Sequence, residues 1–242
     1  MTIPASANEI LLQAQTIAKL QGRQWDGQLE HILLFCIQYP TFFPKKAMVN
    51  LSDGLLPGSS VLQKYLTKYL SDYYREREGT IALKESATRP DLAVDTVLSA
   101  FAQADAATLT LMSIYHRQSM AAENLIGKLL ERYIASAVEP LGWIWCCGET
   151  VWSVDFLRPN NANYHLLQIK NRTNSENSSS AAIRMNRSLN IQVWKRINAA
   201  TGQTYWDVFP ENEPVAGVRP LSEEGFHAFI VQSANKLTVK FE

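Results

Sequence analysis

The sequence predicts an α/β (α+β) fold in which a helical N-terminal half precedes a mixed central sheet flanked by helices. Two observations favour this fold class. Up to about residue 115, apolar residues recur at intervals of three and four, which is the period of amphipathic helices. Past residue 140, short runs rich in aromatic and β-branched residues alternate with turn residues, as in strands. We therefore expect a helical region over residues 1–115, packed on a core over residues 116–242 as one compact domain.

Composition excludes several classes of protein. Hydrophobic residues make up 46% and charged residues 19%, so the chain is globular rather than disordered. The N-terminus lacks a secretory signal and no run of about 18 apolar residues occurs, which favours a cytoplasmic protein with no membrane segment. The cysteines Cys36, Cys146 and Cys147 lack the spacing of a zinc site, so we expect buried thiols.

Four helices are expected in the first half. They cover residues 8–20, residues 25–38, a segment from a Ser60 cap to Tyr74, and a segment that follows an Asp91 cap. The apolar stripe of the fourth helix consists of Val94, Val97, Leu98 and Phe101. Nothing in this half carries visible chemistry, so its expected role is that of a scaffold or a dimerisation surface.

A stronger amphipathic helix is expected over residues 120–138. At 100° per residue, one arc contains the side chains of Ile126, Leu129, Leu130, Tyr133, Ile134 and Ala137. Glu123 falls inside this arc, and Glu131 lies on its edge. Because a carboxylate on an apolar face is costly unless it is paired or binds a metal, Glu123 is a candidate site residue. The alternative is an acid stabilised by the helix dipole, if the helix begins only near Ala121.

Three consecutive short strands are expected after this helix. Pro140 ends the helix, and the segments WIWCC (143–147) and VWSVDFL (151–157) indicate a hairpin. YHLLQIK (164–170) follows an Asn-rich turn as a third strand, which completes an antiparallel meander. Further on, we expect two basic helices at 181–187 and 191–200, a strand at YWDVFP (205–210), a helix within 222–237, and a terminal strand or tail.

Asp155, Gln168 and Lys170 form the centre of the predicted site. Gln168 and Lys170 stand two positions apart on one strand, so they project from the same face toward Asp155 on the strand before. Phosphodiester hydrolysis needs a nucleophilic water and charge stabilisation on the phosphate and leaving oxygen, which a divalent cation held by carboxylates provides. We therefore predict a metal-dependent nuclease centre in which Asp155 and the carbonyl oxygen of Ile169 bind Mg²⁺ and Lys170 orients the water.

Gln168 stands where such a centre would use an acid. Its amide can offer a carbonyl oxygen to a metal, but the site loses one negative charge. A second carboxylate should compensate, and we expect Glu123 to supply it as a catalytic and metal-binding residue, with Glu131 in reserve. The sharpest structural prediction is that Glu123 lies near Asp155.

Positive charge gathers on and after this motif. The whole chain has 23 basic and 23 acidic residues, but the segment from Arg158 to Arg196 has seven basic residues and one acid. The stretch NRTNSENSSS (171–180) has no apolar residue, and such polar and basic side chains can contact phosphates and base edges. A flexible polar loop is the alternative. The candidate DNA-binding residues are Asn171, Arg172, Asn174, Ser175, Asn177, Ser178, Ser179, Ser180, Arg184, Arg187, Lys195 and Arg196.

These motifs resemble a known family. VDF (154–156) and QIK (168–170) resemble the two half-motifs of the PD-(D/E)XK nuclease superfamily. QIKNRTNSENSSS, followed by IR and WKR, is similar to the SinI and AvaII type of type II restriction endonucleases, most strongly over residues 123–196. The resemblance implies a restriction-endonuclease-like sheet, Mg²⁺ dependence and a homodimer that cuts both strands of double-stranded DNA at GGWCC, where W is A or T, leaving a short 5′ overhang. It also implies a cognate methyltransferase that acts on the same site without needing to bind the enzyme.

Two other functions stay open at this point. One is a repair or junction nuclease that prefers DNA structure over sequence. The other is a non-catalytic DNA-binding protein on a nuclease-like fold, in which Gln168 would mark decay of the centre, although the retained Lys170 argues against decay. The sequence has no glycine-rich phosphate loop and its four histidines are dispersed, which argues against nucleotide hydrolysis and acyl transfer.

Overall fold

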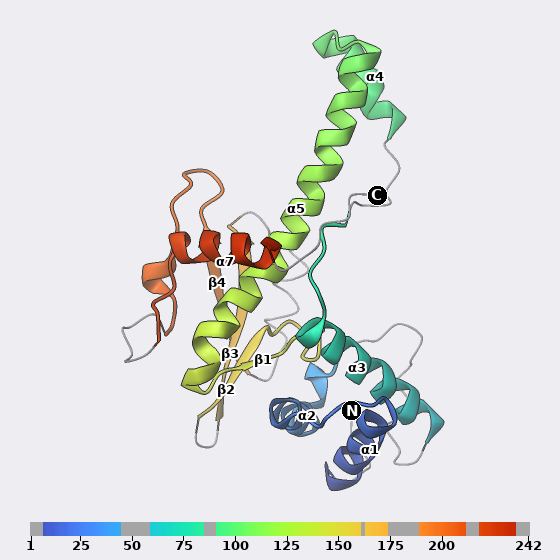
Figure 1. Cartoon of the computed structure of the whole chain (residues 1–242), viewed down its shortest axis with the longest axis vertical. Coiled ribbons are helices and arrows are strands. Elements are labelled where there is room, and N and C mark those ends of the chain that lie inside the picture. Colours follow the sequence, from blue (N-terminus) through green and yellow to red (C-terminus); the bar gives the residue numbers. More distant parts are fainter. Residues whose placement is uncertain are drawn as a thin grey trace.

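A four-stranded mixed sheet lies at the centre of the protein, in a computed structural model that describes residues 7–44, 59–84, 91–160, 163–173, 189–211 and 218–235 (Figure 1). The described α-helices are α1 (Ala7–Leu20), α2 (Gly27–Gln38), α3 (Ser60–Glu78), α4 (Leu92–Ala102), α5 (Ala106–Val138) and α7 (Glu223–Asn235). The strands are β1 (Ile144–Trp145), β2 (Phe156–Asn160), β3 (Asn163–Arg172) and β4 (Ile191–Ile197). Short 3₁₀ turns are η1 (Pro40–Phe42), η3 (Glu139–Leu141) and η4 (Trp206–Val208). The predicted α/β class with a helical first half is confirmed.

Side-chain caps set where the helices begin. Asp26, Asp91 and Asp105 each accept a backbone N–H at the start of α2, α4 and α5, as short acidic residues do at helix N-termini. For α3 the cap is Ser59, whose Oγ accepts from the Leu62 N–H at 3.1 Å, one residue before the predicted cap Ser60. The four helices expected in the first half are therefore present with small shifts in their ends.

The antiparallel pairing of the predicted meander is confirmed, because β1 pairs with β2 and β2 pairs with β3. The second strand begins only at Phe156, five residues after its predicted start, so Asp155 lies immediately before it. Of the two basic helices expected after the meander, the one at residues 191–200 is wrong, and the one at residues 181–187 lies outside the described residues. Residues 191–197 form β4, which pairs parallel with β3, and its β-branched and aromatic residues suit a sheet. The strand expected at residues 205–210 is also wrong, since η4 lies there and Thr204 forms only an isolated bridge to Ile197.

Helix α5 is 33 residues long and begins at Ala106, 14 residues before its predicted start at Met120. The boundary placed between residues 115 and 116 therefore falls inside one continuous helix. The C-terminal part of α5 packs on the sheet and buries Leu129, Leu130 and Ile134. Its N-terminal part leaves the body together with α4, as Figure 1 shows.

The stripe expected on α4 is present in sequence but is not covered, since α4 has no buried residue. The three cysteines are buried free thiols, as predicted. None of the helices in the described ranges combines the length and the apolar character that a membrane span requires.

Candidate active site

Asp155 is fixed by the backbone of the meander. Its carbonyl oxygen accepts the Cys146 N–H at 2.8 Å, and its own N–H donates to the Leu167 carbonyl at 2.9 Å. The carboxylate Oδ2 then accepts the Ile169 N–H at 2.6 Å. Asp155 is thereby held at the start of β2, beside the part of β3 that carries Gln168 and Lys170.

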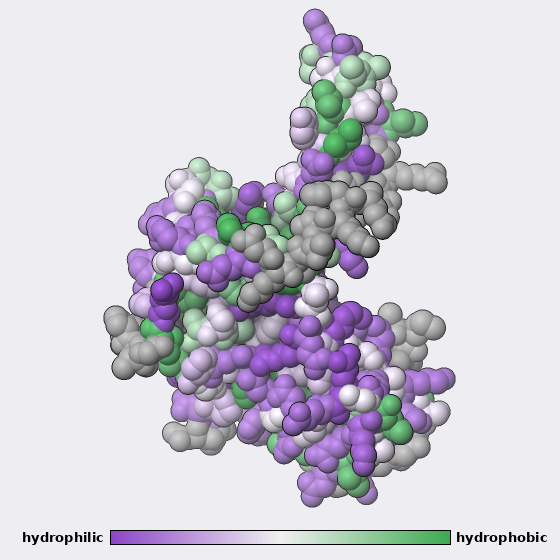
Figure 2. Space-filling model, in the orientation of Figure 1, coloured by the Kyte–Doolittle hydropathy of each residue, from purple (hydrophilic) through white to green (hydrophobic). Residues whose placement is uncertain are grey.

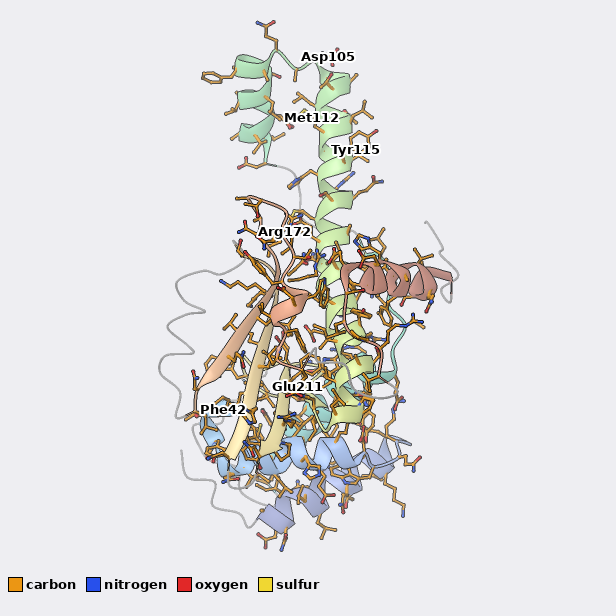
Figure 3. The ribbon with its side chains drawn as sticks, turned by 90° about the vertical axis from the view of Figure 1, so that its left-hand side faces the viewer. Phe42, Asp105, Met112, Tyr115, Arg172 and Glu211 are labelled. Atoms are coloured by element: carbon orange, nitrogen blue, oxygen red, sulfur yellow. The ribbon has the colours of Figure 1, made fainter. Side chains whose placement is uncertain are left out.

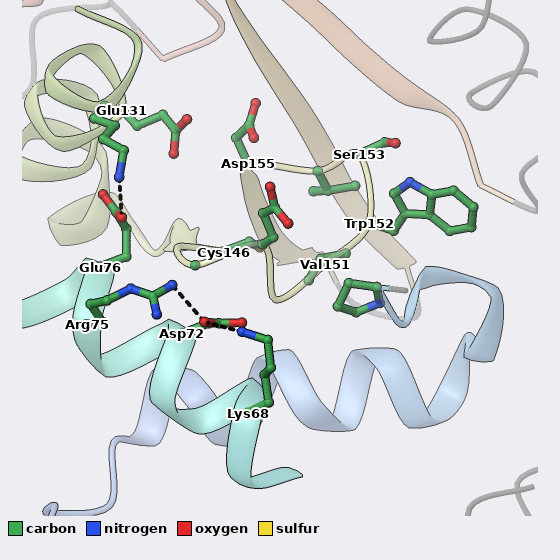
Figure 4. Close-up of a pocket in the computed structure, with 15 residues that line it drawn as sticks. Lys68, Asp72, Arg75, Glu76, Glu131, Cys146, Val151, Trp152, Ser153 and Asp155 are labelled. Carbon is green, nitrogen blue, oxygen red and sulfur yellow. Dashed lines mark hydrogen bonds and ion pairs between the residues drawn. The ribbon is translucent and has the colours of Figure 1, made fainter. Parts of the chain in front are cut away.

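Asp155 shares a cavity with Glu131. The cavity has a volume of about 770 Å³ and lies between α3, the C-terminal part of α5 and the connection from β1 to β2. Figure 4 shows both carboxylates at this cavity above α3, from which Asp72 and Glu76 project. The indole Nε1 of the buried Trp145 donates to Glu131 Oε2 at 3.0 Å, which fixes the orientation of this carboxylate.

The cavity disfavours the ionised form of both carboxyls. The pKa of Glu131 is raised to about 8, first by burial and then by the nearby charge of Asp155, against the lowering effect of the Trp145 hydrogen bond. Burial also raises the pKa of Asp155 to about 6, against the lowering effects of the Ile169 N–H and the Lys170 charge. Two neighbouring carboxyls in this state would both ionise readily only with a cation between them.

The charge of the cavity wall also suits a cation. Its lining contains five acids (Asp72, Glu76, Glu131, Glu149 and Asp155) and three basic residues (Lys68, Arg75 and Lys128), an excess of two negative charges when all five carboxyls are ionised. Within the described ranges, no group of three or more His, Cys, Asp or Glu side chains is arranged to hold a metal by itself. Mg²⁺ is commonly bound by one or two carboxylates together with waters and substrate phosphates, so Asp155 and Glu131 fit this ion.

Glu123 is not in this cavity. Its side chain is 51% exposed, and its Oε1 lies 3.5 Å from Nη1 of Arg172 at the end of β3. The expectation that Glu123 lies beside Asp155 is therefore wrong, and the reserve residue Glu131 holds that place. The physical reason is that the cavity opens at the side of α5 that faces α3, so a residue on the edge of the apolar arc reaches it.

Gln168 and Lys170 lie on β3 as predicted, one strand away from Asp155 in an antiparallel pair. Gln168 is buried and Lys170 is half-buried. Neither belongs to the described residues that line the cavity, but the charge of Lys170 acts on Asp155. The two strands thus bring the motif together, while the roles of Gln168, Lys170 and the Ile169 carbonyl in catalysis stay predictions.

The comparisons with known proteins agree on one family. Residues 59–236, more than half of the chain, match the family model described as SinI restriction endonuclease. The type II restriction enzyme SinI of Salmonella infantis is 38% identical over 231 residues, covering 93% of this chain and 95% of the relative. The type II restriction enzyme Eco47I of Escherichia coli is 36% identical over 219 residues, covering 90% and 92%. This chain belongs to the SinI restriction endonuclease family.

Membership of the SinI family confirms the resemblance to type II restriction endonucleases of the SinI type. Glu131, Asp155 and Lys170 all lie inside the matched range. The first 58 residues lie outside the family model, but the alignments to the two relatives extend over at least 90% of the chain. The cavity therefore belongs to a member of a restriction endonuclease family.

The basic residues predicted to bind DNA differ from one another in their exposure and partners. Arg196 is buried, donates from Nε to Asn171 Oδ1 at 2.9 Å and forms an ion pair with Glu223, so it joins β4 to α7. Arg172 is half-exposed and Lys195 is half-buried. The other candidate DNA-binding residues lie outside the described residues: Asn174, Ser175, Asn177, Ser178, Ser179, Ser180, Arg184 and Arg187.

Helix α3 contributes site residues that the sequence interpretation missed. It was expected to carry no chemistry, yet it lines the cavity with charged side chains: Lys68, Asp72, Arg75 and Glu76. They form ion pairs, such as Arg75 to Asp72 at 2.7 Å and Lys128 of α5 to Glu76 at 2.9 Å. The signal was present, because charges that recur at spacings of three and four mark one face of a helix.

Proposed function

We propose that this type II restriction endonuclease hydrolyses both strands of duplex DNA with Mg²⁺ at GGWCC, where W is A or T. The observation that supports the catalytic part is that two half-buried carboxyls, Asp155 and Glu131, line one cavity next to the strand that carries Lys170. The recognition sequence rests on the resemblance to the SinI and AvaII type.

Asp155 and Glu131 would hold the metal, and the carbonyl oxygen of Ile169 would add a neutral ligand. When bound, Mg²⁺ would polarise the scissile phosphate and stabilise the leaving oxygen. Lys170 would orient the attacking water from the neighbouring strand and stabilise the charge that develops on the phosphate. Gln168 would contribute an amide in place of the usual acid.

We assign the second carboxylate to Glu131 rather than to Glu123. Glu131 shares a cavity with Asp155 and is oriented by Trp145, whereas Glu123 is half-exposed and paired with Arg172. The negative charge that Gln168 does not supply would thus come from α5, but from a position eight residues further along the helix than Glu123.

Sequence recognition would lie on the polar segment after Lys170 and on β4. Arg172 and Lys195 are candidates for phosphate contacts, and Arg184 and Arg187 for phosphates or guanine edges, since Arg can bind guanine through two hydrogen bonds. The Asn and Ser residues between 171 and 180 would read bases or position the backbone. We leave Arg196 out of the contact surface, because its guanidinium is already bound by Asn171 and Glu223.

Cleavage of both strands would require two such centres, so we propose that the active enzyme is a homodimer. Two-fold symmetric enzymes match two-fold symmetric DNA sites such as GGWCC.

The test is incubation of the full chain with a long duplex DNA and Mg²⁺, followed by sequencing of the fragment ends. We expect discrete ends at GGWCC and no cleavage without a divalent cation. Ends at another motif would overturn the recognition sequence alone. Tight binding without cleavage in Mg²⁺ or Mn²⁺ would favour the non-catalytic alternative that the neutral Gln168 suggests.

A further inference from the structure

An apolar arm projects from the body. We define the arm as residues 91–120, which comprise α4 and the N-terminal part of α5 (Figure 1). Of the thirteen strongly exposed large apolar residues in the described ranges, eight lie in the arm, including Phe101 at 87% and Tyr115 at 65% exposure. Figure 2 shows hydrophobic side chains gathered there, and Figure 3 shows Met112 and Tyr115 along the projecting part of α5.

These residues form helix faces rather than isolated side chains. Val94, Val97 and Phe101 recur at spacings of three and four on α4, and Leu111 and Tyr115 are four residues apart on α5. Helix α4 has 11 residues, none of them buried, and a helix of this length is marginal without tertiary packing. An exposed apolar face of this kind marks an interaction surface.

The charge of the arm argues against DNA as its partner. Residues 91–120 contain three acids (Asp91, Asp95 and Asp105) and one arginine (Arg117), which is a net charge of −2 with His116 neutral. Duplex DNA is bound through positive charge, so an apolar and slightly acidic surface repels it. The partner should therefore be an apolar protein surface.

We propose that the arm is the surface through which two copies of this chain associate. A two-fold interface brings the same patch of both copies together, so an apolar patch with few charges is complementary to itself. The inference rests on the proposed function, because cutting both strands at one site requires two catalytic centres held together. The arm would then join two bodies that each carry one cavity, and DNA binding would stay with the basic segment after β3.

The test compares two double variants of the full chain. Phe101→Glu with Tyr115→Glu places one charge on each helix of the arm, whereas Leu12→Glu with Val231→Glu changes two similarly exposed residues outside it, at 65% and 59% exposure. Molar mass would be measured by sedimentation equilibrium and light scattering, with and without a GGWCC duplex. Circular dichroism would confirm that each variant keeps its helices.

We expect the natural protein and the control variant to have twice the 27.2 kDa mass of one chain, and the arm variant to have the mass of one chain. On a supercoiled plasmid with one site, the arm variant should lose linearisation at least tenfold and leave mostly nicked circles. A folded arm variant that stays dimeric, or a natural protein that is monomeric on DNA while it linearises the plasmid, would overturn the inference. A dimer that never cleaves DNA would instead refute the proposed function and leave the arm interface standing.

Discussion

The two ends of α5 show how one helix serves two purposes. All of its buried residues lie from Ala121 onward, where it covers the sheet, while residues 106–120, which belong to the arm, bury none. Apolar residues occur in both parts, so their presence on a helix does not show which stretch of it the body covers. Glu123 and Glu131 both lie in the part of α5 that covers the sheet, but only Glu131 lines the cavity that α5 forms with α3 and the connection from β1 to β2.

The largest loss of cleavage should come from substitutions of Asp155 and Lys170. Asp155→Asn and Lys170→Ala should each lower Mg²⁺-dependent cleavage by about 10³-fold or more, since each removes several kcal/mol of charge stabilisation in the transition state. Gel-shift assays in Ca²⁺ should still detect specific DNA binding. Cleavage within about tenfold of the natural rate would refute the assignment of the centre.

Glu131 and Glu123 provide a matched pair on the same helix. Glu131→Gln should lower cleavage by on the order of 100-fold and raise the Mg²⁺ concentration needed for half-maximal rate, because it removes a charged ligand. Glu123→Gln should stay within about twofold, because an exposed ion pair such as the one with Arg172 contributes about 1 kcal/mol or less. Single-turnover rates across a Mg²⁺ series would measure both, and a larger loss for Glu123→Gln would reverse the assignment.

A smaller effect should come from the indole that orients Glu131. Trp145→Phe keeps an aromatic ring but removes the Nε1 hydrogen bond, so metal affinity should fall by about tenfold, as for other groups that position metal ligands. Trp143→Phe is the control, since its buried Nε1 has no hydrogen-bond partner among the described residues. Calorimetric titration with Ca²⁺ would compare them. Equal losses in both variants would indicate a packing effect rather than orientation of Glu131.

The smallest effect concerns the stability of the metal-free protein. The folded-state pKa values of Glu131, about 8, and Asp155, about 6, lie above their ordinary values, so the folded protein binds more protons than the unfolded chain between about pH 4 and 8. Its free energy of unfolding should therefore rise as the pH falls through this window, by at most about 1.4 kcal/mol per pH unit for each proton.

Glu131→Gln should flatten that dependence, because glutamine does not titrate. Urea unfolding at several pH values, compared with Glu123→Gln, would isolate the contribution of Glu131. An identical pH dependence in both variants would show that Glu131 titrates normally. Saturating Mg²⁺ should also reduce the dependence in the natural protein, because the bound ion favours the ionised carboxylates.

The parts of the fold that could be predicted are those that depend on residues close together in the sequence. The meander that places Asp155 beside Gln168 and Lys170 joins strands close together in the chain, so alternation and turn residues were sufficient. Strand β4 pairs in parallel with β3 across a longer connection, and its short run of mixed apolar and basic residues fits either period. Its parallel pairing therefore had no local signal in the sequence.

The cavity itself depends on contacts distant in sequence. Asp72 and Glu76 of α3 reach Glu131 and Asp155 only through tertiary packing, so charge spacing on α3 marked a face but not its neighbour. The same limit explains Glu123, because the apolar arc of α5 did not show that the cavity would open at the edge of that arc, where Glu131 lies. Arg196 shows a further case, because its acidic partner Glu223 lies 27 residues away on α7.

The most direct test of the account is a crystal structure of the enzyme with a GGWCC duplex and Ca²⁺, which occupies such centres through oxygen ligands. We predict an ion with carboxylate oxygens of both Asp155 and Glu131 at about 2.3–2.6 Å, and with Glu123 outside the coordination sphere. An ion bound by Asp155 together with Glu123, or by neither Asp155 nor Glu131, would contradict the account.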